Sequence, residues 1–297
     1  MNSEMLVREA MACYGLGDLA GFLSFLNPDV EWIVHSAAPL PFGGSYRGPQ
    51  AVSGLFADTG KLLQVSGILW SNFLSLGEQT ALYGMASHRC LTNGSQETAA
   101  FAHWYEVRDN LIVRVQQFFD TASIQRMLEG KPSLRPVAKN ASSTVEAIGL
   151  LASISQQVDA NESEDFSAIL GLYGPEAPPR SITLPERADK NIEWSSSGMG
   201  SLPTAGLFYG VEAFGRHIAI ARQLLGNYCL HIDGQISIGN TLALHGRMTL
   251  DPLIYNQQVS PYWFQALTVR DGKILRGVEV FDSQGLVSTL MPMPGSD

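Results

Sequence analysis

The sequence is poor in basic residues and has no long apolar run. Nineteen Lys and Arg residues stand against 28 Asp and Glu residues, which gives a formal net charge of −9. This charge has the wrong sign for binding a phosphate backbone, so we expect no nucleic-acid partner. No apolar run approaches the roughly 18 residues of a membrane-spanning helix, and the N-terminus lacks the pattern of an export signal. We therefore expect a cytoplasmic protein with no membrane partner.

Cysteine is also scarce. The three cysteines, Cys13, Cys90 and Cys229, are odd in number and far apart, which argues against a disulfide framework and against a cysteine-based zinc site. The six histidines show no metal-binding spacing such as a helical His-x3-His pair. The Gly-Leu-Gly turn at 15–17 has no Lys-Ser/Thr after it and is not a nucleotide motif. We expect no metal and no cofactor.

The most informative feature of the chain is an internal repeat. One offset of 162 residues carries five separate blocks of the first half onto matching blocks of the second. The matching blocks are Glu31-Trp32 with Glu193-Trp194, Gly48 with Gly210, Ala81-Leu82 with Ala243-Leu244, Val107-Arg108-Asp109 with Val269-Arg270-Asp271, and Phe119-Asp120 with Phe281-Asp282. A repeat of this length is the size of a complete domain. The sequence predicts two copies of one domain, at residues 1–130 and 144–297, joined by a linker at 131–143.

Each half places its helical patterns before its β-rich runs. In the first half, helical spacing covers residues 5–25 with a break at 15–17, and a further helix is predicted at 50–63. Strands are predicted at 30–34, 68–76, 80–91, 98–107 and 111–119. The pattern predicts an α+β fold in which each half is a cone, with a curved antiparallel sheet and about three helices.

The second half departs from the first in one place. Its helical spacing resumes at 144–158, but about 15 additional residues then precede its first strand, around the Pro-rich stretch 175–179. We interpret this insertion as a surface loop, with a lid over the mouth of the cone as the alternative.

Two segments resemble a known family. The run His103–Arg114 that leads to Phe119-Asp120 resembles the closing hairpin of the SnoaL-like branch of the NTF2-like superfamily, and Gly43–Gly48 resembles its loop before the third helix. This group includes ketosteroid isomerase, polyketide cyclases and limonene-type epoxide hydrolases. The resemblance implies two NTF2-like (cystatin-like) cones that pair within one chain, as relatives pair by homodimerisation. Such an intramolecular pseudo-dimer leaves further homo-oligomerisation open.

The catalytic patterns of the family fit this chain only in part. The isomerase's acidic base at the end of the first strand would fall on positions 34–35 and 196–197, where no acid stands. The Asp-Arg-Asp set of the limonene-type hydrolases has no counterpart. The polyketide cyclases pair an acid on the last strand with a His on its neighbour, and these positions are Gln117 and His103 in the first half and Glu279 and Gln265 in the second. Each half therefore keeps one member of the pair.

Strand alternation selects the same four positions independently. Side chains two residues apart share one face of a strand, and each of these polar residues interrupts an apolar row. An unpaired polar group in such a row costs ~1–3 kcal/mol, so it is normally satisfied locally or kept for a ligand. We expect all four side chains to point into their own cones.

These observations define the candidate site residues. A carboxylate on an apolar face suits general acid–base chemistry, so Glu279 is the principal catalytic candidate. Tyr262 and His245 are its possible electrophilic partners, and His103 is a further candidate. The alternative is that Glu279 pairs with Arg276, Arg247 or His245 and closes the cavity floor. The ligand-binding candidates are Tyr14, Trp32, His35, Tyr105, Gln117, Trp194 and Gln265. Asp120 and Asp282 are expected to cap local backbone.

Three functions are compatible with this sequence. The first is a cofactor-independent acid–base enzyme of isomerase, cyclase or dehydratase type, acting on a hydrophobic oxygenated molecule such as a polyketide or terpenoid. The second is a non-catalytic protein that binds a small hydrophobic ligand. The third is an epoxide hydrolase or cyclase, although the sequence offers few of the paired carboxylates that this reaction needs.

Overall fold

The computed structural model describes residues 2–36, 40–131, 164–175, 177, 184–198, 202–226, 228–250 and 260–290. Almost all of the predicted linker at 131–143, the helical pattern at 144–158 and most of the Pro-rich stretch at 175–179 lie outside the described residues. The domain boundaries therefore stay a prediction.

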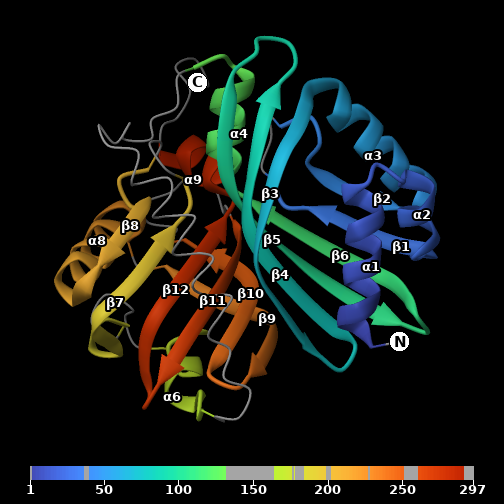
Figure 1. Ribbon diagram of the computed structural model, residues 1–297. Coiled ribbons are helices and arrows are strands. Elements are labelled where there is room, and N and C mark those ends of the chain that lie inside the picture. Colours follow the sequence, from blue (N-terminus) through green and yellow to red (C-terminus); the bar gives the residue numbers. More distant parts are fainter. Residues whose placement is uncertain are drawn as a thin grey trace.

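The first domain is a six-stranded sheet with helices on one face (Figure 1). Its helices are α1 (Ser3–Gly15), α2 (Leu19–Ser24), α3 (Gly48–Leu62) and α4 (Thr121–Leu128). Its strands are β1 (Leu26–Val34), β2 (Gly44–Arg47), β3 (Leu63–Leu76), β4 (Gln79–Cys90), β5 (Gln96–Arg108) and β6 (Leu111–Phe119). The strand order is β2-β1-β6-β5-β4-β3. The sheet is mixed and not purely antiparallel as predicted, because β1 runs parallel to β6.

The second domain repeats this topology. Its strands are β7 (Ala188–Ser196), β8 (Gly206–Tyr209), β9 (Cys229–Ile238), β10 (Thr241–Thr249), β11 (Tyr262–Arg270) and β12 (Lys273–Phe281). Its described helices are α6 (Ser167–Leu170), α8 (Gly210–Leu225) and α9 (Ser283–Leu290). The order β8-β7-β12-β11-β10-β9 matches that of the first sheet. Gln265 lies opposite Glu279 as His103 lies opposite Gln117, so the repeat in the sequence is a repeat of backbone geometry.

Local sequence explains where the elements begin. The side chain of Asn2 accepts a hydrogen bond from the Met5 amide and caps α1, and Asp18 caps α2 in the same way. Gly48 and its counterpart Gly210 both have positive φ, 78° and 77°, at the points where β2 and β8 turn into helices. Only glycine adopts such a backbone without strain, which is why this position is glycine in both halves.

The two sheets face one another, with the helices α1 to α3 on the far side of the first sheet (Figure 1). Each domain has its own apolar core, around Trp32 in the first and Trp194 in the second. A third cluster fills the space between the sheets. It consists of Leu74, Ala81, Tyr83, Ala102, Trp104 and Phe118 from the first domain and Ile236, Ala243, Phe264, Ala266, Val278 and Val280 from the second. The protein is an intramolecular pseudo-dimer.

Helices α4 and α9 also lie side by side and join the domains (Figure 1). Neither helix was predicted from the sequence. No helix in the part of the chain that the structure describes has the length and apolar character needed to cross a membrane.

Candidate functional site

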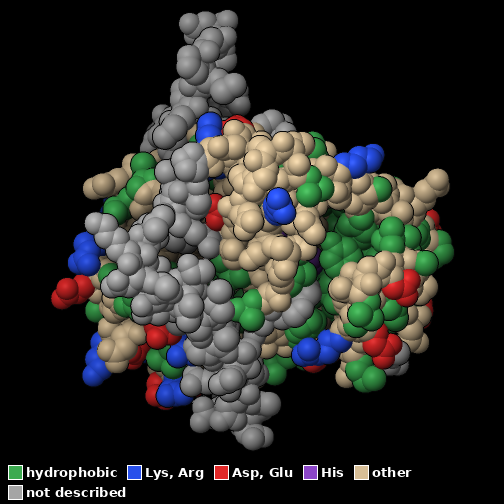
Figure 2. Space-filling view, turned by 45° about the horizontal axis from the view of Figure 1, so that its top comes forward, with side chains coloured by type: hydrophobic (Ala, Val, Ile, Leu, Met, Phe, Trp, Pro, Cys, Tyr) green, Lys and Arg blue, Asp and Glu red, His purple; other side chains and the backbone are tan. Residues whose placement is uncertain are grey.

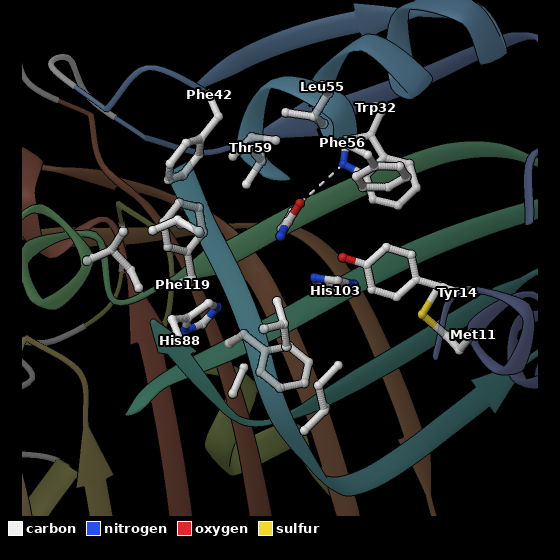
Figure 3. Close-up of a pocket in the computed structure, with 18 residues that line it drawn as sticks. Met11, Tyr14, Trp32, Phe42, Leu55, Phe56, Thr59, His88, His103 and Phe119 are labelled. Atoms are coloured by element: carbon white, nitrogen blue, oxygen red, sulfur yellow. Dashed lines mark hydrogen bonds between the residues drawn. The ribbon is translucent and has the colours of Figure 1, made fainter. Parts of the chain in front are cut away.

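The first cone encloses a cavity of about 130 Å³. Its wall is mostly apolar, and Figure 3 shows the side chains that converge on it from α1, α3 and the sheet. The apolar lining includes Met11, Val34, Phe42, Leu55, Phe56, Phe101 and Phe119, and the polar lining includes Tyr14, Thr59, His88, His103 and Gln117. In the space-filling view of Figure 2, hydrophobic side chains gather on the right, over this domain. The cavity has the character of a small-molecule site, with an apolar wall and a few polar groups.

The hydrogen bond between His103 Nδ1 and Tyr105 leaves the other ring nitrogen, Nε2, to face the cavity. His103 Nδ1 lies 2.9 Å from the Tyr105 hydroxyl, which in turn lies 3.6 Å from the sulfur of Met11. A thioether only accepts, so the Tyr105 proton can go to Met11 while the Tyr105 oxygen accepts from Nδ1–H. In this arrangement Nε2 is an unprotonated acceptor, and no described residue hydrogen-bonds to it.

Gln117 presents a donor beside this acceptor. Its side-chain oxygen accepts a hydrogen bond of 3.2 Å from the Trp32 indole N–H, shown as the dashed line in Figure 3. Because an indole N–H only donates, the amide group must turn its oxygen toward Trp32 and its NH₂ toward the cavity. The cavity wall therefore holds one acceptor and one donor on neighbouring strands.

Burial keeps the histidines of this cavity neutral. Desolvation lowers the pKa of His103 to about 3 and that of His88 to about 4. The same effect raises the pKa of the buried Tyr105 hydroxyl. At neutral pH the first cavity therefore carries no charge on these groups and is lined by neutral hydrogen-bonding groups.

The second cone uses the same positions but leaves less space, about 30 Å³. Glu279 lines this cavity and accepts hydrogen bonds from Gln265 at 2.8 Å and Ser196 at 3.2 Å. Gln265 also accepts one of 2.5 Å from the hydroxyl of Tyr173, whose ring stacks on Trp263. All four sequence-selected strand residues therefore point into their own cones.

The alternative prediction, that Glu279 pairs with Arg276, Arg247 or His245, is wrong. Arg276 pairs with Glu193 at 2.7 Å and Arg247 with Asp233 at 3.1 Å, while His245 lies on the opposite face of the sheet. The absence of a side chain at Gly277 opens no space beside Glu279, because a Cβ at this glycine would lie 2.1 Å from the Trp194 ring.

Three predicted site residues lie between the domains and not in a cone. His35, His245 and Tyr262 all line a separate cavity of about 350 Å³ at the interface. His35 stacks on Tyr262 with ring centroids 3.8 Å apart and bonds to Gln116 at 3.0 Å. Trp263 and Leu244 face the second core. Tyr262 and His245 are their neighbours in sequence and therefore point to the opposite face of the sheet. Neither residue can act as an electrophilic partner of Glu279.

The remaining ligand-binding candidates lie in or behind the cones. Tyr14 and Trp32 line the first cavity and Trp194 the second. Tyr105 is buried behind His103 and does not line the cavity, and Gln265 is covered by Tyr173. The main residue that sequence reasoning missed is Tyr173, because it belongs to the insertion and no periodic pattern marks it. His88 could have been found, since it continues the alternation of inward residues from Ala86.

Among the described residues, no group of three or more His, Cys, Asp or Glu side chains could hold a metal ion. The three cysteines are free thiols.

Comparison with known proteins finds one family model and several similar solved structures. Residues 7–115 match the family model of the SnoaL-like domain. An NTF2-like protein of unknown function from Burkholderia pseudomallei is 26% identical over 43% of this chain and 98% of its own, with a TM-score of 0.41. A putative SnoaL-like polyketide cyclase from Mesorhizobium loti is 18% identical over 40% of this chain and 99% of its own, with a TM-score of 0.35. No functionally curated protein matches the chain.

Residues 7–115 of the first domain thus match a SnoaL-like domain. The second domain repeats the strand order of the first, so the protein consists of two α+β domains of one topology.

Proposed function

We propose that this protein binds a compact hydrophobic molecule carrying at least one oxygen in the cavity of its first cone, without a cofactor. The observation that carries the proposal is an apolar cavity of about 130 Å³ whose wall includes His103 Nε2 and the Gln117 NH₂, neither of which is hydrogen-bonded to a described residue. An apolar cavity of ~150 Å³ is enough to hold benzene. A ligand built on a single ring fits this space.

Filling the cavity tests the proposal. Leu55 lines the first cavity and is buried, so Leu55→Trp should abolish the binding of small oxygenated ring compounds measured by calorimetry. The matched control is Leu16→Trp, which adds the same side chain at a position that is 86% exposed. Unchanged binding in a folded Leu55→Trp protein would contradict the proposal.

A second candidate is an acid–base enzyme of isomerase, cyclase or dehydratase type on a polyketide- or terpenoid-like substrate. The observation that favours it is Glu279, which faces the cavity of the second cone. If Glu279 is the proton-transfer group, Glu279→Gln should lower kcat by roughly 10²–10⁴. If Glu279 only holds Gln265 and Ser196, turnover survives.

Binding is favoured over catalysis by two features of the cavities. A base works best with a pKa near the operating pH, and the pKa of His103 is about 3. The second cavity of about 30 Å³ holds roughly two waters, at ~10–15 Å³ each. Within the described residues, Glu279 is the one carboxylate that lines either cavity, so epoxide opening by paired carboxylates has no support.

A further inference from the structure

The two cones differ in how far their cavities extend. Eleven residues that line the second cavity, from Trp194 to Leu286, stand 162 positions after residues that line the first. The first cavity extends further, along Phe101 and His103. The counterparts of these two residues, Trp263 and Gln265, do not line the second cavity.

Tyr173 contacts both of these counterparts. Its ring is buried and stacks on Trp263, with centroids 5.6 Å apart and an interplanar angle of 20°. Its hydroxyl donates a 2.5 Å hydrogen bond to the Gln265 side-chain oxygen. The residue comes from the segment between α6 and β7, where the second half carries its insertion and the first half has no counterpart.

A chain of hydrogen bonds fixes the orientation of the Gln265 side-chain amide. Its NH₂ donates to Glu279, and Glu279 accepts from Ser196 as well. Because the amide NH₂ faces a carboxylate, which only accepts, its oxygen must face Tyr173. The second cone thus presents an acceptor to a phenol hydroxyl at the strand position that His103 occupies in the first cone.

We propose that Tyr173 is a built-in ligand, and that the first cone takes a free para-substituted phenol in the equivalent place. This inference rests on the proposed function of the first cone. The phenol ring would lie against Phe101 where Tyr173 lies against Trp263. Its hydroxyl would donate to His103 Nε2 and accept from the Gln117 NH₂.

His103 and Gln117 together fit a hydroxyl better than a carbonyl. An acceptor at His103 and a donor at Gln117 match a group that both donates and accepts. A carbonyl oxygen would use the Gln117 donor but leave the His103 nitrogen unpaired, which is unfavourable in a buried site. The opposite tautomer of His103 would present two donors and reverse this preference, so the choice of ligand reports the tautomer.

The first experiment measures selectivity in the wild-type protein by calorimetry, with 4-methylphenol, toluene and 4-methylcyclohexanone as probes. We expect one site for 4-methylphenol, with affinity at least tenfold above that for either other probe, because a site built around a hydroxyl rejects analogues that lack it. His103→Leu should remove the preference over toluene. Equal or tighter binding of toluene or the ketone overturns this inference but leaves the proposed function standing. Absence of binding by all three probes overturns both.

The second experiment counts sites after Tyr173 is removed. Tyr173→Ala should raise the number of 4-methylphenol sites from one to two, since an apolar cavity left by a ring accepts a ring-sized ligand. Tyr173→Phe keeps the ring and should keep one site, and Tyr209→Ala, at a half-exposed tyrosine outside the cones, should also keep one. A folded Tyr173→Ala protein with one site overturns the assignment of Tyr173. If that variant does not fold, the wild-type selectivity decides.

Discussion

His103 shows how much of a residue's chemistry is set by its neighbours. The sequence places it on an inward strand face, but its hydrogen bond to Tyr105 and its burial determine its state. A neutral imidazole with a pKa of about 3 hydrogen-bonds well and is a weak base at neutral pH. The same residue type in an open, charged site would be a credible proton acceptor, so residue identity alone does not separate binding from catalysis.

Replacing either of two glycines, Gly277 and Gly60, by alanine should change stability in opposite directions. A Cβ at Gly277 would overlap the Trp194 ring at 2.1 Å, whereas a Cβ at Gly60 in α3 meets nothing within 4 Å. Gly277→Ala should lower the free energy of unfolding by roughly 1–3 kcal/mol through overpacking. Gly60→Ala should raise it by up to about 1 kcal/mol, because alanine favours the helix. Urea unfolding of both variants checks this, and a neutral Gly277→Ala would show that Trp194 can move aside.

Whether there is space beside Glu279 could not be predicted from the sequence. Alternation correctly places Gly277 and Glu279 on one face, but the absence of a side chain at Gly277 does not create a cavity. The indole of Trp194, from the neighbouring strand β7, fills the space. Sequence patterns give the face of a strand, and only packing shows what covers that face.

At the scale of elements, the first turn of each of the helices α4 and α9 is hydrogen-bonded to residues of the other domain. Thr121 at the start of α4 donates a 2.6 Å hydrogen bond to Asp282, and Ser283 at the start of α9 donates one of 2.7 Å to Asp120. The two bonds are related by the 162-residue offset. Asp120 also caps its own helix through the Ser123 amide, so the prediction that the two aspartates cap local backbone is confirmed but incomplete.

Breaking one of these bonds should destabilise the whole protein. Thr121→Val keeps the shape of the side chain but removes the donor to Asp282 and the acceptor for the Gln284 amide. We expect a loss of about 1–3 kcal/mol in the free energy of unfolding, since buried polar groups lose their partners. Ser24→Ala, which removes a hydroxyl from an exposed helix end, should change it by less than about 0.5 kcal/mol. Equal effects of the two changes would show that these hydrogen bonds between the domains contribute nothing.

The elements themselves were largely predictable. Strand β6 begins and ends where the sequence predicts, and the break between α1 and α2 falls at Gly15 to Gly17. The parallel pairing of β1 with β6 was not predictable, because it joins strands far apart in the chain. Helices α4 and α9 were missed because each is only eight residues long and the two pack against each other across the domains.

At the scale of the whole molecule, two buried histidines make the domain interface sensitive to acid. Burial lowers the pKa of His35 to about 4 and that of His245 to about 3. They lie on opposite sides of the interface, His35 against Tyr262 and His245 against Trp104. Protonation of either ring would place a charge between the two sheets.

The sign of the pH dependence follows from these values. The unfolded chain binds a proton at each histidine near pH 6.5, whereas the folded protein does so only near pH 3–4. The unfolded state therefore binds more protons in this window, and stability falls as pH decreases from 6.5 toward 4. Between pH 8 and pH 5 we expect a loss of roughly 2 kcal/mol per histidine.

Urea unfolding at pH 8 and pH 5 measures this loss. The double variant His35→Gln, His245→Gln should show a smaller loss between the two pH values than the wild type, by up to roughly 4 kcal/mol. His88 and His103, whose pKa values are also lowered, should account for most of the remaining loss and serve as the internal reference. An unchanged pH dependence in the double variant would show that the interface histidines are hydrated or already charged.

The sequence by itself determined the tandem repeat, the α+β class of each half and the inward position of the four polar strand residues. The repeat follows from comparing the chain with itself, and the other two properties depend on periodicity, which is local in the chain. Tertiary structure alone decided which cone has the larger cavity, because contacts such as that of Tyr173 with Gln265 join residues 92 positions apart. It also decided that His35, His245 and Tyr262 lie between the domains, since the packing of one sheet on another determines what covers their outer faces.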